Sequence, residues 1–167
     1  MKKATRTVLI AIFILVIVAI PLYHYTRPDS TQPGTLIVKG KVNNPLNLTI
    51  TQLEEYPSVT IRLTLTSSSR EEDNGIFNYT GVLIKDLINQ AQTKDDTKSV
   101  YVQASDGYGT TISLQDIETK NIIIAYEKDG AQLKPFKDNG EGPFRLIIAD
   151  EQYAQRWVRD VVSLEVN

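Results

Sequence analysis

The sequence predicts an α+β fold, a β-rich mixed-sheet domain preceded by one N-terminal transmembrane helix. Three observations lead to this prediction: an unbroken apolar run over Val8–Tyr23, strict alternation over Ser58–Thr66, and a strand–turn–strand pattern over Ser99–Leu114. They divide the chain into a transmembrane segment over residues 1–25, a linker over 26–34 and a domain over 35–167.

The N-terminal apolar run predicts a signal anchor. As a helix, Val8–Tyr23 is about 24 Å long, slightly short of the ~30 Å hydrocarbon core. Lys2, Lys3 and Arg6 precede it, and basic flanks stay cytoplasmic, so we expect a single-pass protein of the cell membrane with its domain on the extracytoplasmic side. A cleaved signal peptide is the alternative. The bulky residues after the run, with no Ala-x-Ala site, favour an uncleaved anchor.

The start of the domain predicts a strand and a short helix. Residues 26–34 contain two prolines and no apolar periodicity, which is typical of a spacer. Thr35–Val42 predicts a strand that ends at a turn over residues 43–45. Thr49 and Gln52 have the spacing of a capping box, so a short helix is expected before Pro57.

The next segment predicts a strand, a loop and a helix. Ser58–Thr66 alternates apolar and polar residues, the period of a half-buried strand. Ser67–Asn78 is polar and predicts an exposed loop. Apolar residues then recur at helical spacing at Leu83, Ile84, Leu87, Ile88 and Ala91.

The centre of the chain predicts a hairpin followed by a helix. Asp106, Gly107 and Gly109 supply the backbone freedom of a tight turn. Ser113 and Asp116 have the pattern of a helix start. Two interpretations of the turn remain open: an aspartate that caps its own backbone, or a tip that carries a functional Asp106 and Tyr108.

The last third predicts three more strands. They are Asn121–Tyr126, followed by a hairpin turn over residues 128–130, then residues 142–148 and finally Val161–Val166.

Composition excludes several classes of function. The chain has no cysteine and one histidine, which excludes disulfides, thiolate metal sites and a multi-histidine metal site. Residues 34–167 carry 14 basic and 19 acidic side chains, and no basic stripe is present. We therefore expect no nucleic-acid partner.

Several motifs resemble, in register, those of the sulfite-oxidase-like, molybdopterin-binding oxidoreductase domain family. Ser105–Tyr108 resembles its SDGY-type turn. Tyr79–Leu87 resembles a W/Y-x-G-V-x-L-x-D-L-L element, Ala125–Leu133 an A-Y-x-x-N-G-x-x-L element, and Gly142–Ile148 a G-x-P-x-R-L-V-V strand. Gln155–Val158 stands where the family has a Lys-Trp pair. The resemblance covers about residues 35–166 and implies the sulfite-oxidase molybdopterin-binding fold.

The resemblance also implies a cofactor site with one essential residue changed. In the family, a cysteine in an L-x-C-x-x-N/S-R pattern holds molybdenum, a metal suited to soft thiolate. Here that pattern places Thr66 at the cysteine position and keeps Arg70. A threonine hydroxyl is a hard, high-pKa group and a poor replacement. The resemblance implies that Arg156 replaces a lysine that contacts the pterin phosphate, since guanidinium binds phosphate well.

Six residues are therefore candidates for a cofactor-binding or ligand-binding site: Thr66, Arg70, Asp106, Tyr108, Arg145 and Arg156. Two of them have a simpler interpretation. Arg156 is alternatively a surface ion-pair partner, and Arg145, between two apolar residues of a strand, alternatively points outward. No catalytic or metal-binding residue is predicted.

Three functions follow from this sequence. The first is a non-catalytic, membrane-anchored binding module for a small anionic or pterin-like ligand or a protein partner, with no cofactor. The second is an oxidoreductase that retains molybdopterin without a cysteine ligand. The third is a structural interaction subunit of a membrane complex.

Overall fold

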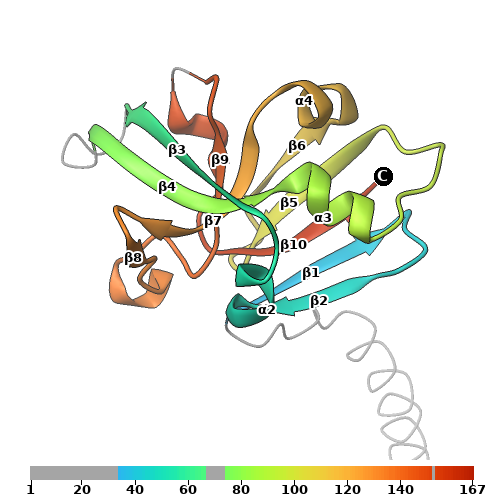
Figure 1. Cartoon of the computed structure of the whole chain (residues 1–167), viewed down its shortest axis with the longest axis horizontal. Helices are drawn as coiled ribbons and strands as arrows, with labels where there is room; N and C mark the ends of the chain where they lie inside the picture. The colour runs from blue at the N-terminus through green and yellow to red at the C-terminus, as the bar shows by residue number, and fades with distance from the viewer. Residues whose placement is uncertain (1–33, 67–73, 152) are drawn as a thin grey trace, which may run out of the picture. The chain divides into compact units, whose positions relative to one another are not determined.

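The computed structural model describes residues 34–66, 74–151 and 153–167, which form part of one compact unit over Thr31–Asn167. The predicted transmembrane segment and most of the linker lie outside the described residues. Within the described part, no helix has both the length and the apolar character needed to cross a membrane. The described residues build two sheets and three short α-helices (Figure 1).

The first sheet has the strand order β2-β1-β10-β5-β6. Its strands are β1 (Thr35–Gly40), β2 (Leu46–Thr49), β5 (Ser99–Ala104), β6 (Gly109–Ser113) and β10 (Val161–Val166). β1 and β10 are parallel, and the other neighbours are antiparallel, so the sheet is mixed as predicted. The closing strand β10 thus lies between the entry strand β1 and the central hairpin β5–β6.

The second sheet has β7 at its centre. It contains β3 (Ser58–Leu65), β4 (Gly75–Leu83), β7 (Ile122–Lys128), β8 (Ala131–Gln132) and β9 (Arg145–Ile148). β3 and β4 form a long antiparallel ribbon, and β8 and β9 both pair with β7 (Figure 1). Two strands were not predicted: β2, and β4, whose first residues were expected to lie in a loop. Residues 75–78 are extended because they pair with residues 62–65 of β3.

The helices begin where local sequence predicts. Thr49 and Gln52 form a full capping box at α2 (Ile50–Glu54), and the Ser113 hydroxyl accepts a hydrogen bond from the Asp116 amide at α4 (Leu114–Thr119). α3 (Ile84–Gln90) starts one residue later than the apolar pattern suggested, because Leu83 still belongs to β4. Two 3₁₀ turns, η2 (Phe136–Asp138) and η3 (Ala154–Arg156), complete the described elements.

One hydrophobic cluster joins the two sheets. It includes Leu36 and Val102 from the first sheet, Ile123 and Leu146 from the second, and Leu87 from α3, all fully buried. Burial of apolar surface is the main stabilising term in such a domain. A buried polar group in this setting therefore needs hydrogen-bond partners.

Candidate functional site

The short turn η3 brings three of the predicted residues together. The Ala154 amide donates to the Thr66 carbonyl at 3.4 Å, and the Tyr108 hydroxyl donates to the Gln155 carbonyl at 3.0 Å. Arg156, the third residue of η3, reaches the Thr111 carbonyl of β6 at 3.5 Å. Thr66, Tyr108 and Arg156 therefore lie around one turn, at a point where the two sheets meet.

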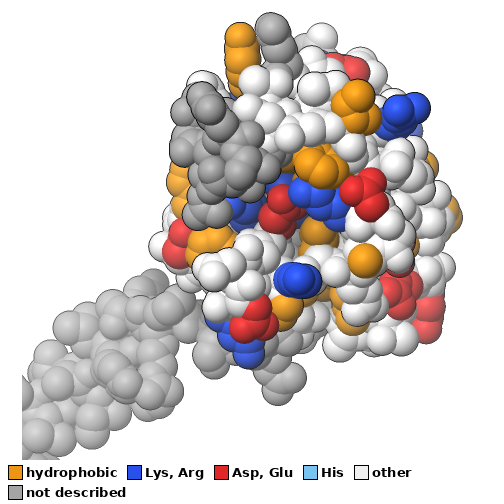
Figure 2. Space-filling model, turned by 90° about the vertical axis from the view of Figure 1, so that its left-hand side faces the viewer, with side chains coloured by type: hydrophobic (Ala, Val, Ile, Leu, Met, Phe, Trp, Pro, Cys, Tyr) orange, Lys and Arg blue, Asp and Glu red, His pale blue; other side chains and the backbone are white. Residues whose placement is uncertain are grey.

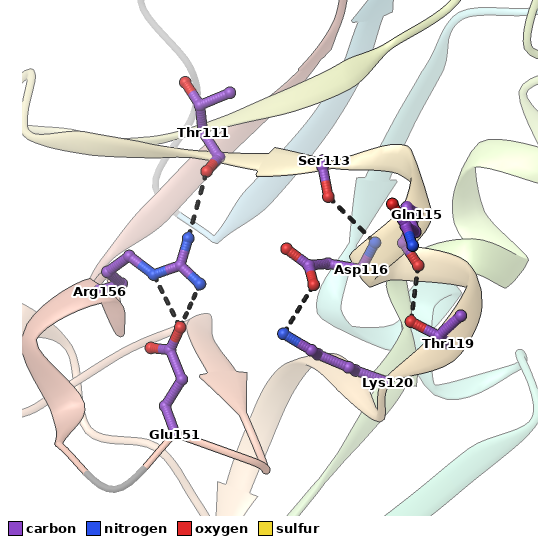
Figure 3. A network of polar contacts seen from close by, with 8 residues as sticks. All are labelled: Thr111, Ser113, Gln115, Asp116, Thr119, Lys120, Glu151 and Arg156. Carbon is purple, nitrogen blue, oxygen red and sulfur yellow. Dashed lines mark hydrogen bonds and ion pairs between the residues drawn. The ribbon is translucent and has the colours of Figure 1, made fainter.

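Arg156 forms a surface ion pair, as the simpler interpretation of this residue predicted. Its Nε donates to Glu151 Oε1 at 2.7 Å, and Nη2 contacts the same oxygen. Its side chain is 40% exposed. Figure 3 shows the Arg156–Glu151 pair beside β6, with Asp116 and Lys120 of the α4 region directed toward it. Lys120 and Ser113 hold the pKa of Asp116 below its usual range, with a smaller contribution from Arg156.

Asp106 does not point into the site. It is exposed, and its carboxylate accepts a hydrogen bond from the Tyr108 amide at 2.9 Å, so it caps its own turn. Tyr108 itself is 54% exposed even though its hydroxyl is bonded. The remaining candidate of this region, Arg70, lies outside the described residues.

Arg145 is buried, and the prediction of an outward-pointing strand residue is wrong. Its exposed fraction is 5%, and the residues on either side of it, Phe144 and Leu146, are fully buried in the core. Its Nη1 donates to the Tyr79 hydroxyl at 2.9 Å and forms an ion pair with Glu141. Its guanidinium carbon lies 5.4 Å from the centroid of the Tyr79 ring and 5.8 Å from that of Trp157.

Four side chains therefore form a polar cluster against the core, which we call the Glu141 cluster: Tyr79, Lys128, Glu141 and Arg145. The Tyr79 hydroxyl donates to Glu141 Oε2 at 2.9 Å, and Lys128 Nζ lies 3.1 Å from Glu141 Oε1. Lys128 Nζ also lies 3.7 Å from the centroid of the Phe77 ring. Figure 2 shows basic and acidic side chains interleaved across the middle of the face that it draws, without a field of one sign.

The cluster shifts two pKa values in opposite directions. Burial raises the pKa of Tyr79 far above its ordinary value, and the nearby Glu141 carboxylate adds to the rise against the opposing charge of Arg145. Burial alone would also raise the pKa of Glu141. The Arg145 charge and hydrogen bond, assisted by Lys128 and Tyr79, outweigh burial and hold the pKa of Glu141 below its usual range. At neutral pH the cluster thus holds a neutral phenol, one carboxylate and two cations.

Sequence reasoning missed Tyr79, Lys128 and Glu141. Tyr79 and Lys128 lie 62 and 13 positions from Glu141 in the chain, so no local pattern links them to it. The available signal was Glu141 itself, an acidic residue between two glycines and four positions before Arg145.

A pocket of about 390 Å³ lies apart from these residues. Its walls include Ser105, Phe136 and Val161, and its lining contains neither Thr66 nor either of the two paired arginines. Asp160, also in its lining, accepts a hydrogen bond from the Ser105 hydroxyl. The described candidate residues and the Glu141 cluster therefore do not line this pocket.

Two curated relatives, both nitrate reductases, match most of this chain. It is 28% identical to the nitrate reductase [NADPH] of Leptosphaeria maculans over 75% of this chain and 17% of that protein. It is 27% identical to the nitrate reductase [NADH] of Volvox carteri over 87% of this chain and 21% of that protein. The chain thus spans about a fifth of the length of these relatives.

A solved structure supports the fold. The sulfane dehydrogenase SoxCD of Paracoccus pantotrophus superposes with a TM-score of 0.69 at 19% identity, covering 84% of this chain and 39% of that chain. The sequence profile of the oxidoreductase molybdopterin binding domain matches residues 24–167. The chain therefore belongs to the oxidoreductase molybdopterin binding domain family, as a short version without the molybdenum-ligand cysteine.

Proposed function

We propose that this chain is a membrane-anchored, extracytoplasmic member of the family that works without molybdenum chemistry, as a non-catalytic module that binds a small anionic ligand rather than a pterin. The observation that carries the proposal is Thr66. It stands at the position of the family's ligand cysteine, in a chain that contains no cysteine.

The residues present do not fit a molybdenum atom held through protein sulfur. The threonine hydroxyl is a hard donor that stays protonated at neutral pH, whereas thiolate is soft and ionises readily. The Thr66 carbonyl is used structurally, as the acceptor for the Ala154 amide. Within residues 34–66, 74–151 and 153–167, no group of three or more His, Cys, Asp or Glu residues is placed to hold a metal ion.

The cationic residues also fit a bound cofactor phosphate poorly. Arg145 is paired with Glu141, and Arg156 is paired with Glu151. A cofactor phosphate would have to displace a carboxylate from each arginine, at the cost of leaving that carboxylate beside new negative charge. This arrangement favours a ligand smaller than the whole cofactor, and we derive no redox step for this chain.

The membrane anchor rests on the sequence of residues 1–25. Basic residues before an apolar run of this length support a single-pass orientation with the domain outside. We expect the full chain to stay in the membrane fraction after a sodium carbonate wash. We also expect protease added to intact cells whose outer layers have been made permeable to digest the domain. Release of the chain by carbonate, or protection of the domain from protease, would contradict this part of the proposal.

Two exposed tyrosines favour a second candidate, an interaction subunit of a membrane complex. Tyr108 is 54% exposed and Tyr153 is 51% exposed, and both lie beside η3. Tyrosine is enriched at the centres of protein interfaces, where its ring is buried and its hydroxyl stays bonded. Crosslinking in the native membrane tests this candidate: a specific partner supports it, and an uncrosslinked chain argues against it.

The main proposal is tested on the full chain, extracted in detergent from cells that make molybdenum cofactor. The purified protein is denatured and oxidised, and the released pterin is measured by fluorescence. We expect no pterin beyond the background of an unrelated membrane protein prepared in parallel. About one pterin per chain would instead establish the oxidoreductase alternative that retains the cofactor.

A further inference from the structure

The pocket of about 390 Å³ has mostly apolar walls, formed by Pro135, Phe136, Pro143, Val161 and Val162. Ser105 and Asp160 also line it, but the Ser105 hydroxyl is already used as a donor to the Asp160 carboxylate. Lys137 and Gly34 belong to the lining as well. The pocket therefore suits the apolar part of a ligand whose charged part stays outside, near the lysine.

Three cations stand at or beside this pocket. Lys137 lines it, and Lys134, which is exposed, directly precedes the wall residue Pro135. The guanidinium carbon of Arg159 lies 5.8 Å from the centroid of the Phe136 ring. None of these three cations forms an ion pair with another residue of the described part of the chain. Their charges are therefore available to a partner.

The local charge is opposite to that of the domain. Residues 34–167 carry 14 basic and 19 acidic side chains, so the domain as a whole is acidic. Beside the pocket, the three cations are accompanied by two carboxylates: Asp138, which is exposed, and Asp160, which accepts the Ser105 hydroxyl. An excess of one positive charge remains here, and it favours an anionic partner.

Phe136 adds an exposed aromatic ring to the same place. Its side chain is 41% exposed, and it begins the turn η2 between two exposed neighbours, Pro135 and Lys137. Aromatic rings lie at headgroup level where proteins contact a membrane surface, and lysine and arginine attract anionic lipids there. A phospholipid also offers both parts that this region can bind, an anionic headgroup and an apolar chain. A free anion or an acidic peptide lacks the apolar chain.

The covalent connection to the apolar run keeps this region near a bilayer. Gly34 lines the pocket, and residues 24–33 alone separate it from Tyr23, the end of the predicted anchor. Even when fully extended, a segment of that length spans only about 35 Å. In a chain anchored by its apolar run, the side of the domain that carries Gly34 is therefore held within that distance of the membrane surface.

We propose that Lys134, Phe136, Lys137 and Arg159, which we call the Phe136 rim, form a docking face for anionic phospholipids of the membrane that anchors the chain. The lipid phosphate lies at the cations, the Phe136 ring lies at headgroup level, and the adjoining pocket takes the upper part of an acyl chain. This inference rests on the membrane anchor of the proposed function and adds a second contact between the domain and the bilayer.

A single introduced cysteine reports this contact, because the chain has no cysteine of its own. The full chain is reconstituted at one chain per nanodisc in phosphatidylcholine with phosphatidylglycerol, and Asp138→Cys carries a fluorescent label. Glu118→Cys is the matched control: it is also exposed, loses the same charge, and belongs to α4, well away from β8 (Figure 1). The measurement is quenching of each label by lipids that carry a spin label on the headgroup.

We expect strong quenching of the label at position 138 and little at position 118. Lys137→Gln should lower the ratio of docked to undocked domain about fivefold, the effect of one lysine at an anionic surface. Phe136→Ser should also reduce the quenching, because it removes the ring from the interface. Lys98→Gln removes the same charge from an exposed lysine just before β5, and it should leave the quenching unchanged.

Equal quenching at positions 138 and 118 would overturn the inference, and so would quenching at position 138 that is unchanged in discs of phosphatidylcholine alone. Shielding of the label at 138 that occurs only when a disc holds two chains would assign the Phe136 rim to a second copy, and it would overturn the inference as well. The carbonate wash separates these failures from failure of the anchor. A chain that stays in the membrane with equal quenching keeps the proposed function, whereas a released chain contradicts the anchor itself.

Discussion

Tyr79 is fully buried, and its hydroxyl is both donor to Glu141 and acceptor from Arg145. Burial raises its pKa far above 10, so the neutral phenol is the form that the fold stabilises. A raised pKa gives stability that is complete below pH 10 and is lost only as the pH rises toward the folded-state value.

We therefore expect Tyr79 not to ionise in an alkaline titration of the folded protein. The absorbance change at 295 nm up to about pH 11, one unit above the ordinary tyrosine value, should have the same amplitude in wild type and Tyr79→Phe. The two curves should separate only where alkaline unfolding begins. A smaller amplitude for Tyr79→Phe in the folded range would show that Tyr79 ionises normally and that the cluster is open to water.

Glu141 has the opposite dependence on pH. Its pKa is lowered, so its contribution to stability is complete above the ordinary value near 4.5 and is lost as the pH falls through the folded-state value. In urea unfolding at pH 7, Glu141→Gln should lose about 2–4 kcal/mol, because two cations remain against the core without their carboxylate.

The control for Glu141 is Glu151→Gln, whose partner Arg156 is well exposed, and which should lose less than about 1 kcal/mol. The difference between wild type and Glu141→Gln should shrink as the pH falls below 4.5. If Glu141→Gln and Glu151→Gln lower the free energy of unfolding by the same amount at pH 7, the Glu141 cluster is no more buried in solution than a surface ion pair.

At the scale of elements, Gly81 sets how β4 presents Tyr79. The register of β4 against β7 shifts between Thr80 and Gly81, so Tyr126 is an extra residue on β7. A Cβ on Gly81 would lie 2.2 Å from the Ile124 carbonyl oxygen and 2.5 Å from the Ala125 Cα. The close approach of the two strands therefore requires glycine at this position.

Gly81→Ala should accordingly destabilise the domain by about 3 kcal/mol or more, because the clash is with backbone and no side chain can move aside. Gly107→Ala is the comparison. A Cβ there meets nothing within 4 Å, and its φ of 86° costs about 1 kcal/mol. Thermal or urea unfolding of both variants measures the difference in stability. If the Gly81→Ala domain were as stable as wild type, β4 and β7 could move apart at this point without cost.

Local sequence predicts the elements whose signals are local. The starts of α2 and α4 follow from capping residues, and the hairpin β5–β6 follows from alternation around a glycine-containing turn. β4 was missed because a polar run precedes it, its own apolar residues do not alternate, and it is extended by pairing with β3 and β7. Arg145 was misjudged for a related reason. Alternation shows which side of a strand a residue faces, but both sides of β9 are buried.

At the scale of the whole molecule, motifs in register predicted the family, and the profile match over residues 24–167 confirms it. The structural relative confirms the fold. The Glu141 cluster could not be predicted in this way. It joins β4, β7, β9 and the loop after η2, whose approach is decided by packing of the complete domain. Of the six residues predicted as a binding site, Arg145 and Arg156 form ion pairs. Their partners are Glu141 and Glu151, which the sequence did not identify.

The central claim is that this scaffold persists without its metal, because a hydroxyl stands where the family has a thiolate. The direct test is the molybdenum-to-protein ratio of the full chain, measured by elemental analysis after expression in cells that make the cofactor. A cysteine-containing member of the family, prepared identically, is the positive control. We expect about one molybdenum per chain in the control and none in this protein. A stoichiometric amount in this protein would contradict the account.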